Sequence, residues 1–535
     1  MKRVAIVGAG PTGIYTFYSL LNSPEPLSVT VYEQAEEAGV GMPYSDDENS
    51  RMMLANIASI EIPPLFMSYL DWLRLQSDNH LARFDVQRET LHDRQFLPRL
   101  LLGEYFRDSF QQIVKQAQQR GFAVDVHESC RVVDLKATEK GVQLWAEGQS
   151  APENYDLVAI ATGHVWPDEE EATRSFFPSP WSGLMEAKIP ACRVGIMGTS
   201  LSGLDAAMAV VIQHGNFIEK EGQPSTFELD KGHEGLKIAL MSRTGVFPEA
   251  DFYCPIPYEP LAVVTDEILQ AEIAAGAEGL LDRVFALIVK ELKQADPAWS
   301  ARVALDTLNA DTLAQTWFAD RREHDPFSWA EANLQEVERN KRNKHTVPWR
   351  YTILRLHEKV QEIVPHLTDA DKERFKSGLA RVFIDNYAAI PSQSIRRLLA
   401  LREAGIISIV TLGQDYTLDV GDERTVIVAG DERYEFDVYI DARGQQAMKS
   451  KDLPFPSLRQ QLLEVGEEIP EVAEDYTLLA PAAARGRIAF GAIPWLMHDQ
   501  PFVQGITACA EIGQAIAKAV IAPSGRIRPR LSSAA

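Results

Sequence analysis

Glycines at the spacing used for dinucleotide binding stand almost at the N-terminus of the sequence. Gly8, Gly10 and Gly13 follow the apolar run at residues 4–7 and precede a helical pattern. In a G-x-G-x-x-G turn of this kind, the first glycine permits a tight turn and the second leaves room for a pyrophosphate. The third lets the helix pack closely on the strand. This context favours a dinucleotide site; a plain strand–helix turn without a ligand is the alternative.

The residues that flank this turn fit the same kind of site. Pro11 and Thr12 begin the expected helix, whose free N–H groups and partial positive charge would face phosphates. Glu33 ends the second expected strand, about 20 residues after the last glycine. Its carboxylate is placed to accept hydrogen bonds from ribose hydroxyls. Gln34 follows directly, and we include it in the expected site.

A second turn, in the stretch VGIMGTSLSGLD, differs from the first at its middle position. Gly198 and Gly203 keep the outer glycines, but Ser200 stands between them. A serine adds a small side chain where the backbone should approach the phosphates, and its hydroxyl could hydrogen-bond to them instead. We expect this turn, together with Ser202, to hold a second dinucleotide transiently, because a transient ligand tolerates a poorer turn.

The end of the next expected strand indicates which dinucleotide binds there. The stretch LMSRTG places Ser242 and Arg243 where a site for NAD usually has an acid. A basic residue suits the 2′-phosphate of NADPH, so the sequence favours NADP over NAD. A solvated arginine at a strand end is the alternative interpretation of this single residue.

Candidates for acid–base chemistry lie on loops. Just before the last expected helix, the stretch PWLMHDQP contains Trp495 and His498. His498 could act as an acid or a base, and Trp495 could wall the site. His164 follows a small-residue turn and is expected near a domain junction. The alternatives are a surface loop with a satisfied histidine and simple packing between domains. No metal-ligand spacing occurs, and we expect no metal site.

The elements that must position these residues alternate between strands and helices. Helices are expected at 67–76 and 97–120, a hairpin at 131–146, and a long polar loop at 215–235. From about 265 to 380 the periodicity is helical and the surface is heavily charged. Strands are then expected in ARVFID, IISIVTL, RTVIVAG and FDVYIDARG, before a final strand, long loop and helix.

Composition and charge narrow the range of partners. The chain has 535 residues and a formal net charge of −23, which disfavours binding to nucleic acid or anionic membrane. The four cysteines are far apart, as is usual in a reducing compartment. No stretch has the length of a membrane span, and the first strand begins too early for a signal peptide. We therefore expect a cytoplasmic protein that acts on a small-molecule substrate, with no prediction of its oligomeric state.

The N-terminal turn and the later strand DLVAIATG together resemble the two-dinucleotide-domain flavoproteins, the broad glutathione-reductase-like superfamily. This resemblance implies FAD at the first turn, with Ala161, Thr162 and Gly163 close to the cofactor. It also implies a last helix whose N-terminus points at the flavin, preceded here by Phe502 and Gly505.

Longer stretches resemble bacterial FAD/NAD(P)-binding proteins of the YdhS type over essentially the whole chain. These stretches are EEAGVGMPYSDD, MMLANIAS, ATGHVWPDEEE and MHDQPFVQG. The second turn is similar to that of NADPH-dependent flavin monooxygenases, with Ser202, Gly203 and Asp205 at matching positions. Those enzymes also carry F-x-G-x-x-x-H between their turns, but Ala187 stands at the histidine position here.

The sequence thus predicts an α/β fold with two Rossmann-like dinucleotide-binding domains and a mainly helical insertion. The expected parts are an FAD-binding domain at 1–190, a nucleotide domain at 191–446 with the insertion at about 255–380, and a return to the FAD-binding domain at 447–535. We expect an FAD-dependent oxidoreductase that uses NAD(P)H, as a monooxygenase of a small polar metabolite. The alternatives are a flavin dehydrogenase or oxidase reduced by its substrate, which Ala187 favours, and a flavin-binding sensor.

Overall fold

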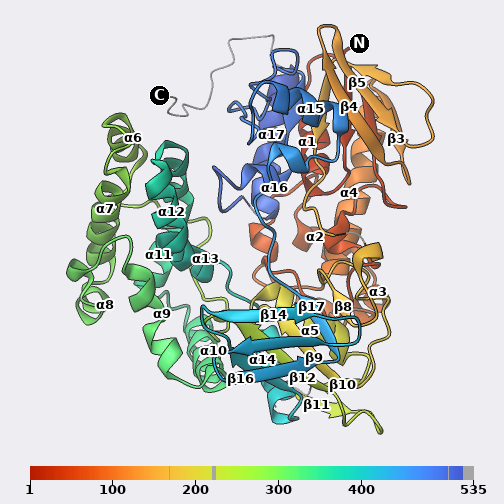
Figure 1. Ribbon diagram of the computed structural model, residues 1–535. Helices are drawn as coiled ribbons and strands as arrows, with labels where there is room; N and C mark the ends of the chain where they lie inside the picture. The colour runs from red at the N-terminus through yellow and green to blue at the C-terminus, as the bar shows by residue number, and fades with distance from the viewer. Residues whose placement is uncertain (168, 220–223, 504, 522–535) are drawn as a thin grey trace. The chain divides into compact units, whose positions relative to one another are not determined.

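A computed structural model describes residues 1–167, 169–219, 224–503 and 505–521. The chain divides into two compact units, coloured by residue number in Figure 1. The first unit comprises Met1–Asp46, Ile57–Val165 and Gln445–Ala535, and the second comprises Asp47–Asn56 and Trp166–Gly444. Each unit is described by itself below.

The first unit is built on a five-stranded parallel sheet in the order β18-β7-β1-β2-β3. A three-stranded antiparallel sheet, β4-β5-β6, packs on it, and the helices follow the strands. The strands are β1 (Arg3–Val7), β2 (Ser28–Tyr32), β3 (Ala123–His127), β4 (Val132–Thr138), β5 (Gly141–Ala146), β6 (Glu153–Tyr155), β7 (Leu157–Ile160) and β18 (Ile488–Phe490). The helices are α1 (Pro11–Leu20), α2 (Tyr69–Leu75), α3 (Asp78–Ala82), α4 (Arg99–Gln119), α15 (Pro456–Glu464), α16 (Ile493–Leu496) and α17 (Ile506–Ile521).

The second unit repeats this plan with the sheet order β13-β12-β9-β17-β8. Its strands are β8 (Phe176–Phe177), β9 (Arg193–Met197), β10 (Gly215–Ile218), β11 (Thr226–Leu229), β12 (Lys237–Ser242), β13 (Ile407–Thr411), β14 (Tyr416–Val420), β15 (Thr425–Ala429), β16 (Glu432–Phe436) and β17 (Val438–Asp441). Its helices are α5 (Leu201–Val211), α6 (Asp266–Ala274), α7 (Leu280–Ala295), α8 (Pro297–Arg302), α9 (Leu313–Glu323), α10 (Pro326–Asn343), α11 (Pro348–Val360), α12 (Asp369–Ser377), α13 (Leu379–Tyr387) and α14 (Ser392–Glu403).

The inner strands of both parallel sheets are apolar along nearly their whole length because both of their faces are covered. In β1 and β9 every residue after the first is buried, as expected for parallel sheets with packed layers on each side. In the first unit one face meets β4, β5 and α15. In the second unit α5, α10 and α14 contribute to the core around β9 and β12. The predicted α/β fold with parallel sheets of the dinucleotide-binding type is confirmed.

The two units have the same order of elements up to one large difference. In each, a strand, a helix and a second strand are followed by a third parallel strand, a three-stranded antiparallel sheet and a fourth parallel strand. The helices α6 to α14 stand between β12 and β13, where the first unit has α2 to α4 between β2 and β3. The predicted helical insertion is therefore present, as an elaboration of one crossover connection.

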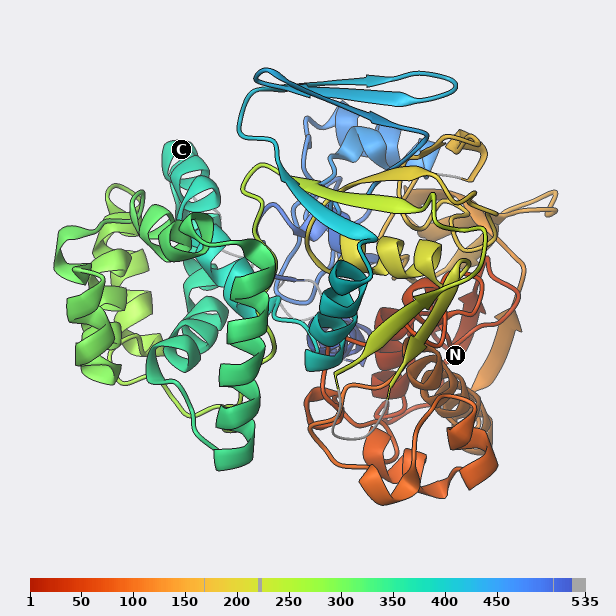
Figure 2. The same cartoon turned by 90° about the horizontal axis from the view of Figure 1, so that it is seen from below.

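Two local expectations were wrong. The run ARVFID, expected as a strand, lies in α13, where Leu379, Val382, Phe383 and Asn386 are buried at helical spacing. Residues 215–235 are not a plain loop, because β10 and β11 pair within them as a hairpin. Figure 2 shows this hairpin beside α14.

The boundaries of the compact units also differ from the expected divisions at 190 and 446. Residues 166–190 belong to the second unit because β8 pairs with β17 and because Leu184 and Ile189 enter its core. Residues 47–56 belong there as well, since Met53 is part of the same core. The guanidinium of Arg397 also donates to the Met52 carbonyl at 2.6 Å.

Two negative findings apply to the described part of the chain. None of its helices combines the length and the apolarity needed to cross a membrane. Within the same residues, no group of three or more His, Cys, Asp or Glu side chains is arranged to hold a metal ion.

A buried histidine in the helical region makes the stability depend on pH. Burial lowers the pKa of His357 to about 4, so the folded state favours the neutral ring, whereas the unfolded chain binds a proton near pH 6.5. This contribution is complete above pH 6.5 and is lost as the pH falls toward 4, by up to about 3 kcal/mol. Urea unfolding at pH 7.5, 6 and 5 is expected to show a steeper decline for the wild type than for His357→Gln. Parallel declines would contradict this assignment.

Candidate functional site

The first glycine turn joins β1 to α1 through contacts that exclude side chains at its outer positions. Gly8 has φ of +100°, and a Cβ there would stand 2.5 Å from the Ala161 carbonyl oxygen. A Cβ on Gly13 would stand 2.1 Å from the carbonyl oxygen of Gly8. The backbone of β1, α1 and the end of β7 therefore meet too closely for any other residue, as expected for this turn.

The middle glycine has a different role, because its own backbone is ordinary. Gly10 is the N-cap of α1 with extended φ and ψ of −76° and −171°. A Cβ on it would meet only the Cα of Gly41, at 3.3 Å. No side chain caps α1, and its first turn, which starts with Pro11 and Thr12, has no acid. The N–H groups and positive end of this helix are thus left for an anion, with no side chain in front of them.

Glu33 supports the turn directly. One carboxylate oxygen accepts a hydrogen bond from the Ala9 N–H at 2.8 Å, and the other accepts from the Ala35 N–H at 2.9 Å. The side chain is only partly buried, and Gln34 beside it is exposed. Glu33 therefore holds the glycine loop against the end of β2, and its contact with a ribose stays a prediction.

The second turn repeats this geometry residue by residue. Gly198 has φ of +139°, and a Cβ on it would stand 2.8 Å from the Ala442 carbonyl oxygen. A Cβ on Gly203 would stand 2.4 Å from the carbonyl oxygen of Gly198. Ser200 is the N-cap of α5 with φ of −97° and ψ of −164°, close to the values of Gly10, and its side chain is exposed and does not cap the helix. The serine thus leaves the backbone of the turn unchanged and adds a hydroxyl in front of α5, near Ser202.

A further turn lies beside each glycine turn, and the sequence analysis did not recognise that these two further turns are equivalent. Ala161 donates its N–H to the Val7 carbonyl, and Ala442 donates in the same way to Met197. Residues 161–163 (ATG) and 442–444 (ARG) therefore occupy equivalent places, directly after β7 and β17. The signal was present, since both follow a buried strand and end in glycine, but only ATG was recognised.

The same comparison aligns the ends of β2 and β12. The N–H of Gly8 donates to the Tyr32 carbonyl and that of Gly198 donates to the Met241 carbonyl, both at 2.8 Å. Ser242 therefore takes the place of Glu33, and Arg243 takes the place of Gln34. The second site lacks the acid that would hold both ribose hydroxyls of NAD, because Ser242 stands at that position. The next residue, Arg243, is exposed.

Helices α1 and α17 lie side by side in the first unit (Figure 1). The side chain of Thr12 acts on that of Cys509, and one turn further along both helices, a Cβ on Gly513 would stand 2.6 Å from the Thr16 backbone nitrogen. The two helices are thus parallel, and their N-termini lie at the same end of the sheet. Gly505, just before α17, has φ of +134° and open space around it.

The candidate acid–base residues are placed in different surroundings. Trp495 is only 2% exposed, packs edge-on against Phe490 at 5.7 Å and donates its indole N–H to the Lys449 carbonyl. Trp495 is therefore a core residue, and a role for it as the wall of a site stays a prediction. His498 Nε2 lies 3.0 Å from the Met448 carbonyl oxygen, which anchors the same loop.

His164 and Phe502 are also largely enclosed. Burial lowers the pKa of His164, and a hydrogen bond with the Gln445 side chain opposes this shift. The ring is therefore neutral at pH 7. Phe502 is buried before α17. Catalytic roles for His164 and His498 stay predictions.

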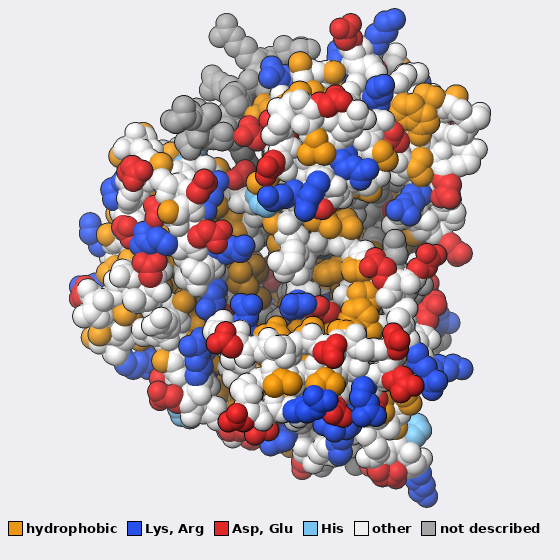
Figure 3. All heavy atoms as spheres, viewed as in Figure 1, with side chains coloured by type: hydrophobic (Ala, Val, Ile, Leu, Met, Phe, Trp, Pro, Cys, Tyr) orange, Lys and Arg blue, Asp and Glu red, His pale blue; other side chains and the backbone are white. Residues whose placement is uncertain are grey.

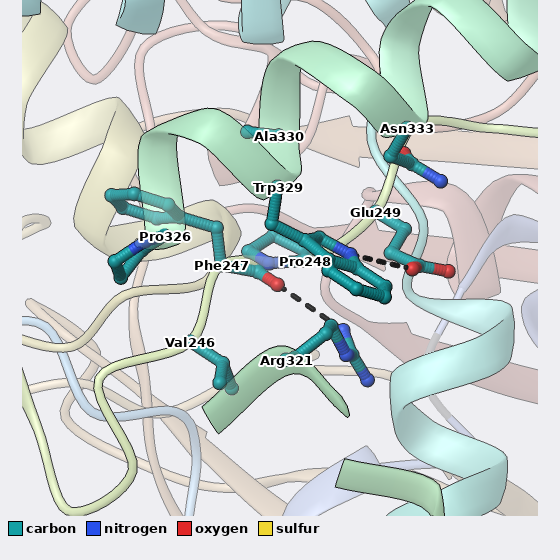
Figure 4. A pocket seen from close by; sticks show the side chains of 9 residues that line it. All are labelled: Val246, Phe247, Pro248, Glu249, Arg321, Pro326, Trp329, Ala330 and Asn333. Carbon is teal, nitrogen blue, oxygen red and sulfur yellow. Dashed lines mark hydrogen bonds between the residues drawn. The ribbon is translucent and has the colours of Figure 1, made fainter. Parts of the chain in front are cut away.

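A pocket in the second unit lies beside the second turn (Figure 4). Its wall at Val246 is tied to that turn, because the Thr199 hydroxyl donates to the Val246 carbonyl at 2.8 Å. Glu249 accepts from the Trp329 indole at 3.0 Å and pairs with Arg350, whose charge lowers the Glu249 pKa against the effect of burial. The nine lining residues are Val246, Phe247, Pro248, Glu249, Arg321, Pro326, Trp329, Ala330 and Asn333. This buried network connects the second turn to α9, α10 and α11.

Comparisons with known proteins agree with this geometry. Residues 5–165 match the FAD-NAD(P)-binding family, and residues 265–387 match the family described as the YdhS-like middle domain. The chain is 68% identical over 532 residues to the "Uncharacterized protein YdhS" of Escherichia coli (strain K12), covering 99% of this chain and 100% of that protein. Ornithine hydroxylase (PvdA) from Pseudomonas aeruginosa has a similar fold at 9% identity and a TM-score of 0.50, over 97% of this chain and 99% of that one. Its reduced form gives 0.51 at 10% identity, over 97% and 100%.

Proposed function

We propose, from the premise that this chain belongs to the YdhS family, that it is a flavin-dependent oxidoreductase in which FAD binds at the first turn and NADPH at the second. The observation that carries the proposal is that the two turns have the same backbone geometry but different residues at two positions. In both, the helix N-terminus has no side-chain cap, which would suit a phosphate. They differ at Ser200 and at Arg243, the positions that face the phosphates and the end of the ribose.

The residues of the first unit fit FAD. The absence of a side chain at Gly10 and the uncapped N-terminus of α1 would suit the pyrophosphate, and Glu33 is close enough to the turn to meet a ribose. The parallel helix α17 would present its N-terminus at the same end of the sheet, which favours negative charge on a reduced ring. Bound flavin would supply the redox chemistry, accepting a hydride from a nicotinamide and passing electrons onward.

We further propose that the electrons reach oxygen and that a small polar metabolite is hydroxylated. The fold shared with a protein named ornithine hydroxylase supports this reaction class. Ala187, at the position where related monooxygenases have a histidine, favours the second candidate, a dehydrogenase or oxidase in which the substrate reduces the flavin.

Anaerobic mixing of the purified protein with NADPH or NADH, followed by the visible flavin absorption, tests these alternatives. Rapid bleaching by a nicotinamide nucleotide without substrate supports the donor site at the second turn. Bleaching by a metabolite but not by either nucleotide would replace the proposal with the dehydrogenase. Bound FAD that neither nucleotide nor metabolite reduces would favour a sensor.

Arg243→Ala tests the choice of nucleotide. Loss of one charge-assisted contact to the 2′-phosphate is expected to raise the Kd for NADPH about 10-fold and to leave NADH within about twofold. The measurement is titration of both nucleotides with the oxidised protein. Equal losses for both would show that Arg243 does not distinguish them.

A further inference from the structure

Two arginines from separate helices meet in the second unit, and the charge of a third, Arg243, acts on one of them. Arg243 follows β12, Arg322 is near the end of α9, and Arg381 is on α13. The guanidinium carbons of Arg322 and Arg381 lie 5.7 Å and 5.4 Å from the centre of the same ring, that of Phe318. Arg321 of α9 lies 5.0 Å from the same ring but is paired with Asp385. Both helices belong to the middle domain, so α9 and α13 bring Arg322 and Arg381 to one place at a shared aromatic residue of α9.

The charges in this cluster repel one another. Burial and the positive charges of Arg322 and Arg243 lower the pKa of Arg381, and Asp385 opposes this shift. Asp385 is engaged elsewhere, because it pairs with Arg321 and accepts from the Trp317 indole at 2.7 Å. Among the residues that the structure describes, none of the three arginines forms an ion pair with a carboxylate. Elsewhere on the helical region, Lys and Arg side chains are interspersed with Asp and Glu (Figure 3).

The position of the cluster points to an anion of a particular kind. Arg243 stands at the strand end that faces the ribose of a nucleotide bound at the second turn. The segment after it is fixed on both sides: the Thr199 hydroxyl donates to the Val246 carbonyl at 2.8 Å, and Arg321 donates to the Phe247 carbonyl at 3.3 Å. The glycine turn, the strand end and α9 are thus one connected framework. A phosphate carries two charges and several acceptor oxygens, which suits more than one guanidinium.

We propose that the middle domain supplies Arg322 and Arg381 to the 2′-phosphate of NADPH, so that this helical insertion helps to determine the choice of nucleotide. The inference rests on the proposed donor site at the second turn and extends it to α9 and α13.

Binding of two nucleotide fragments tests this inference without turnover. Adenosine 2′,5′-bisphosphate and adenosine 5′-monophosphate differ only in the 2′-phosphate, and both can be titrated calorimetrically into the full-length, FAD-loaded protein. Arg381→Gln and Arg322→Gln are each expected to weaken the bisphosphate about 10-fold and to change the monophosphate by no more than about twofold. Arg381→Lys should retain part of the preference. Arg342→Gln on α10 removes an equally exposed charge of the same domain and should change neither affinity.

Each outcome decides a separate point. If the wild type prefers the bisphosphate and both glutamine variants keep that preference in full, the inference fails while the nucleotide site survives. Equal affinity of the wild type for the two fragments also overturns the inference. If neither fragment nor NADPH binds, the proposed donor site fails and the inference fails with it. Arg322 is exposed, so Arg322→Gln keeps the test valid if the half-buried Arg381 cannot be replaced without unfolding.

Discussion

Gly10→Val is expected to yield a folded protein that has lost its FAD. The backbone at Gly10 is extended, with φ of −76°, so valine fits the local conformation, and its Cβ would meet only the Cα of Gly41 at 3.3 Å. Its methyl groups would, however, occupy the space in front of α1 where the pyrophosphate is proposed to bind. We expect the flavin content of the purified variant to fall at least about 10-fold, since steric exclusion removes the phosphate contacts rather than weakening one of them.

The measurement is the ratio of flavin to protein absorption, with circular dichroism as a check on folding. A variant that is as yellow as the wild type would refute FAD binding at the first turn. Replacement at Gly13 would not be informative in the same way, because a Cβ there would stand 2.1 Å from the Gly8 carbonyl oxygen and would disturb the fold itself.

Ser200→Val is expected to give the opposite result, with FAD retained and reduction by NADPH lost. Ser200 is the N-cap of α5 in nearly the same conformation as Gly10, so the substitution places the same methyl groups at the other turn. We expect the Kd for NADPH to rise between about 10- and 100-fold, which corresponds to roughly 1.4–3 kcal/mol. The measurement is anaerobic reduction of the flavin at increasing NADPH.

The two valine variants are matched controls for each other. Each changes one turn and leaves the other intact, so loss of flavin from Ser200→Val as well as from Gly10→Val would indicate a general loss of stability. Ser200→Gly separates bulk from hydrogen bonding: if the hydroxyl contacts a phosphate, this variant should bind NADPH more weakly than the wild type. Wild-type reduction kinetics in Ser200→Val would show that the second turn is not the donor site.

The sequence was most informative where the requirement is local. Some turn positions accept only glycine, because φ is positive there or because a Cβ would overlap a carbonyl oxygen a few residues away. Such a glycine must stand a fixed number of residues from the strand before it and the helix after it. The requirement is local for Gly13 and Gly203, whose Cβ atoms would meet Gly8 and Gly198 of the same turns. Gly8 and Gly198 have positive φ and also contact the more distant Ala161 and Ala442. The parallel sheets, the hairpin at 131–146 and the helical insertion were predictable for the same reason, because apolar periodicity is local too.

Prediction from sequence failed where the outcome depends on contacts between elements that are far apart in sequence. The run ARVFID contains β-branched and aromatic residues that also suit a strand, and only packing within the middle domain selects the helix α13. Trp495 was expected on a loop, but it lies in the short helix α16 and is buried against Phe490. The equivalence of residues 442–444 with 161–163 depends on hydrogen bonds between strands that are far apart in sequence.

The sequence by itself determined that this chain has two turns able to hold dinucleotides and that the second departs from the first at Ser200 and Arg243, because turn geometry is encoded by neighbouring residues. The tertiary structure alone decided that residues 442–444 occupy the same place as residues 161–163, and that Arg322 and Arg381 share the ring of Phe318. Residues 243, 322 and 381 are separated by long stretches of helix, and no spacing relates them. Arg381 of α13 meets Arg322 of α9 because both lie over the ring of Phe318, a residue of α9, and this contact between two helices is a property of the folded chain.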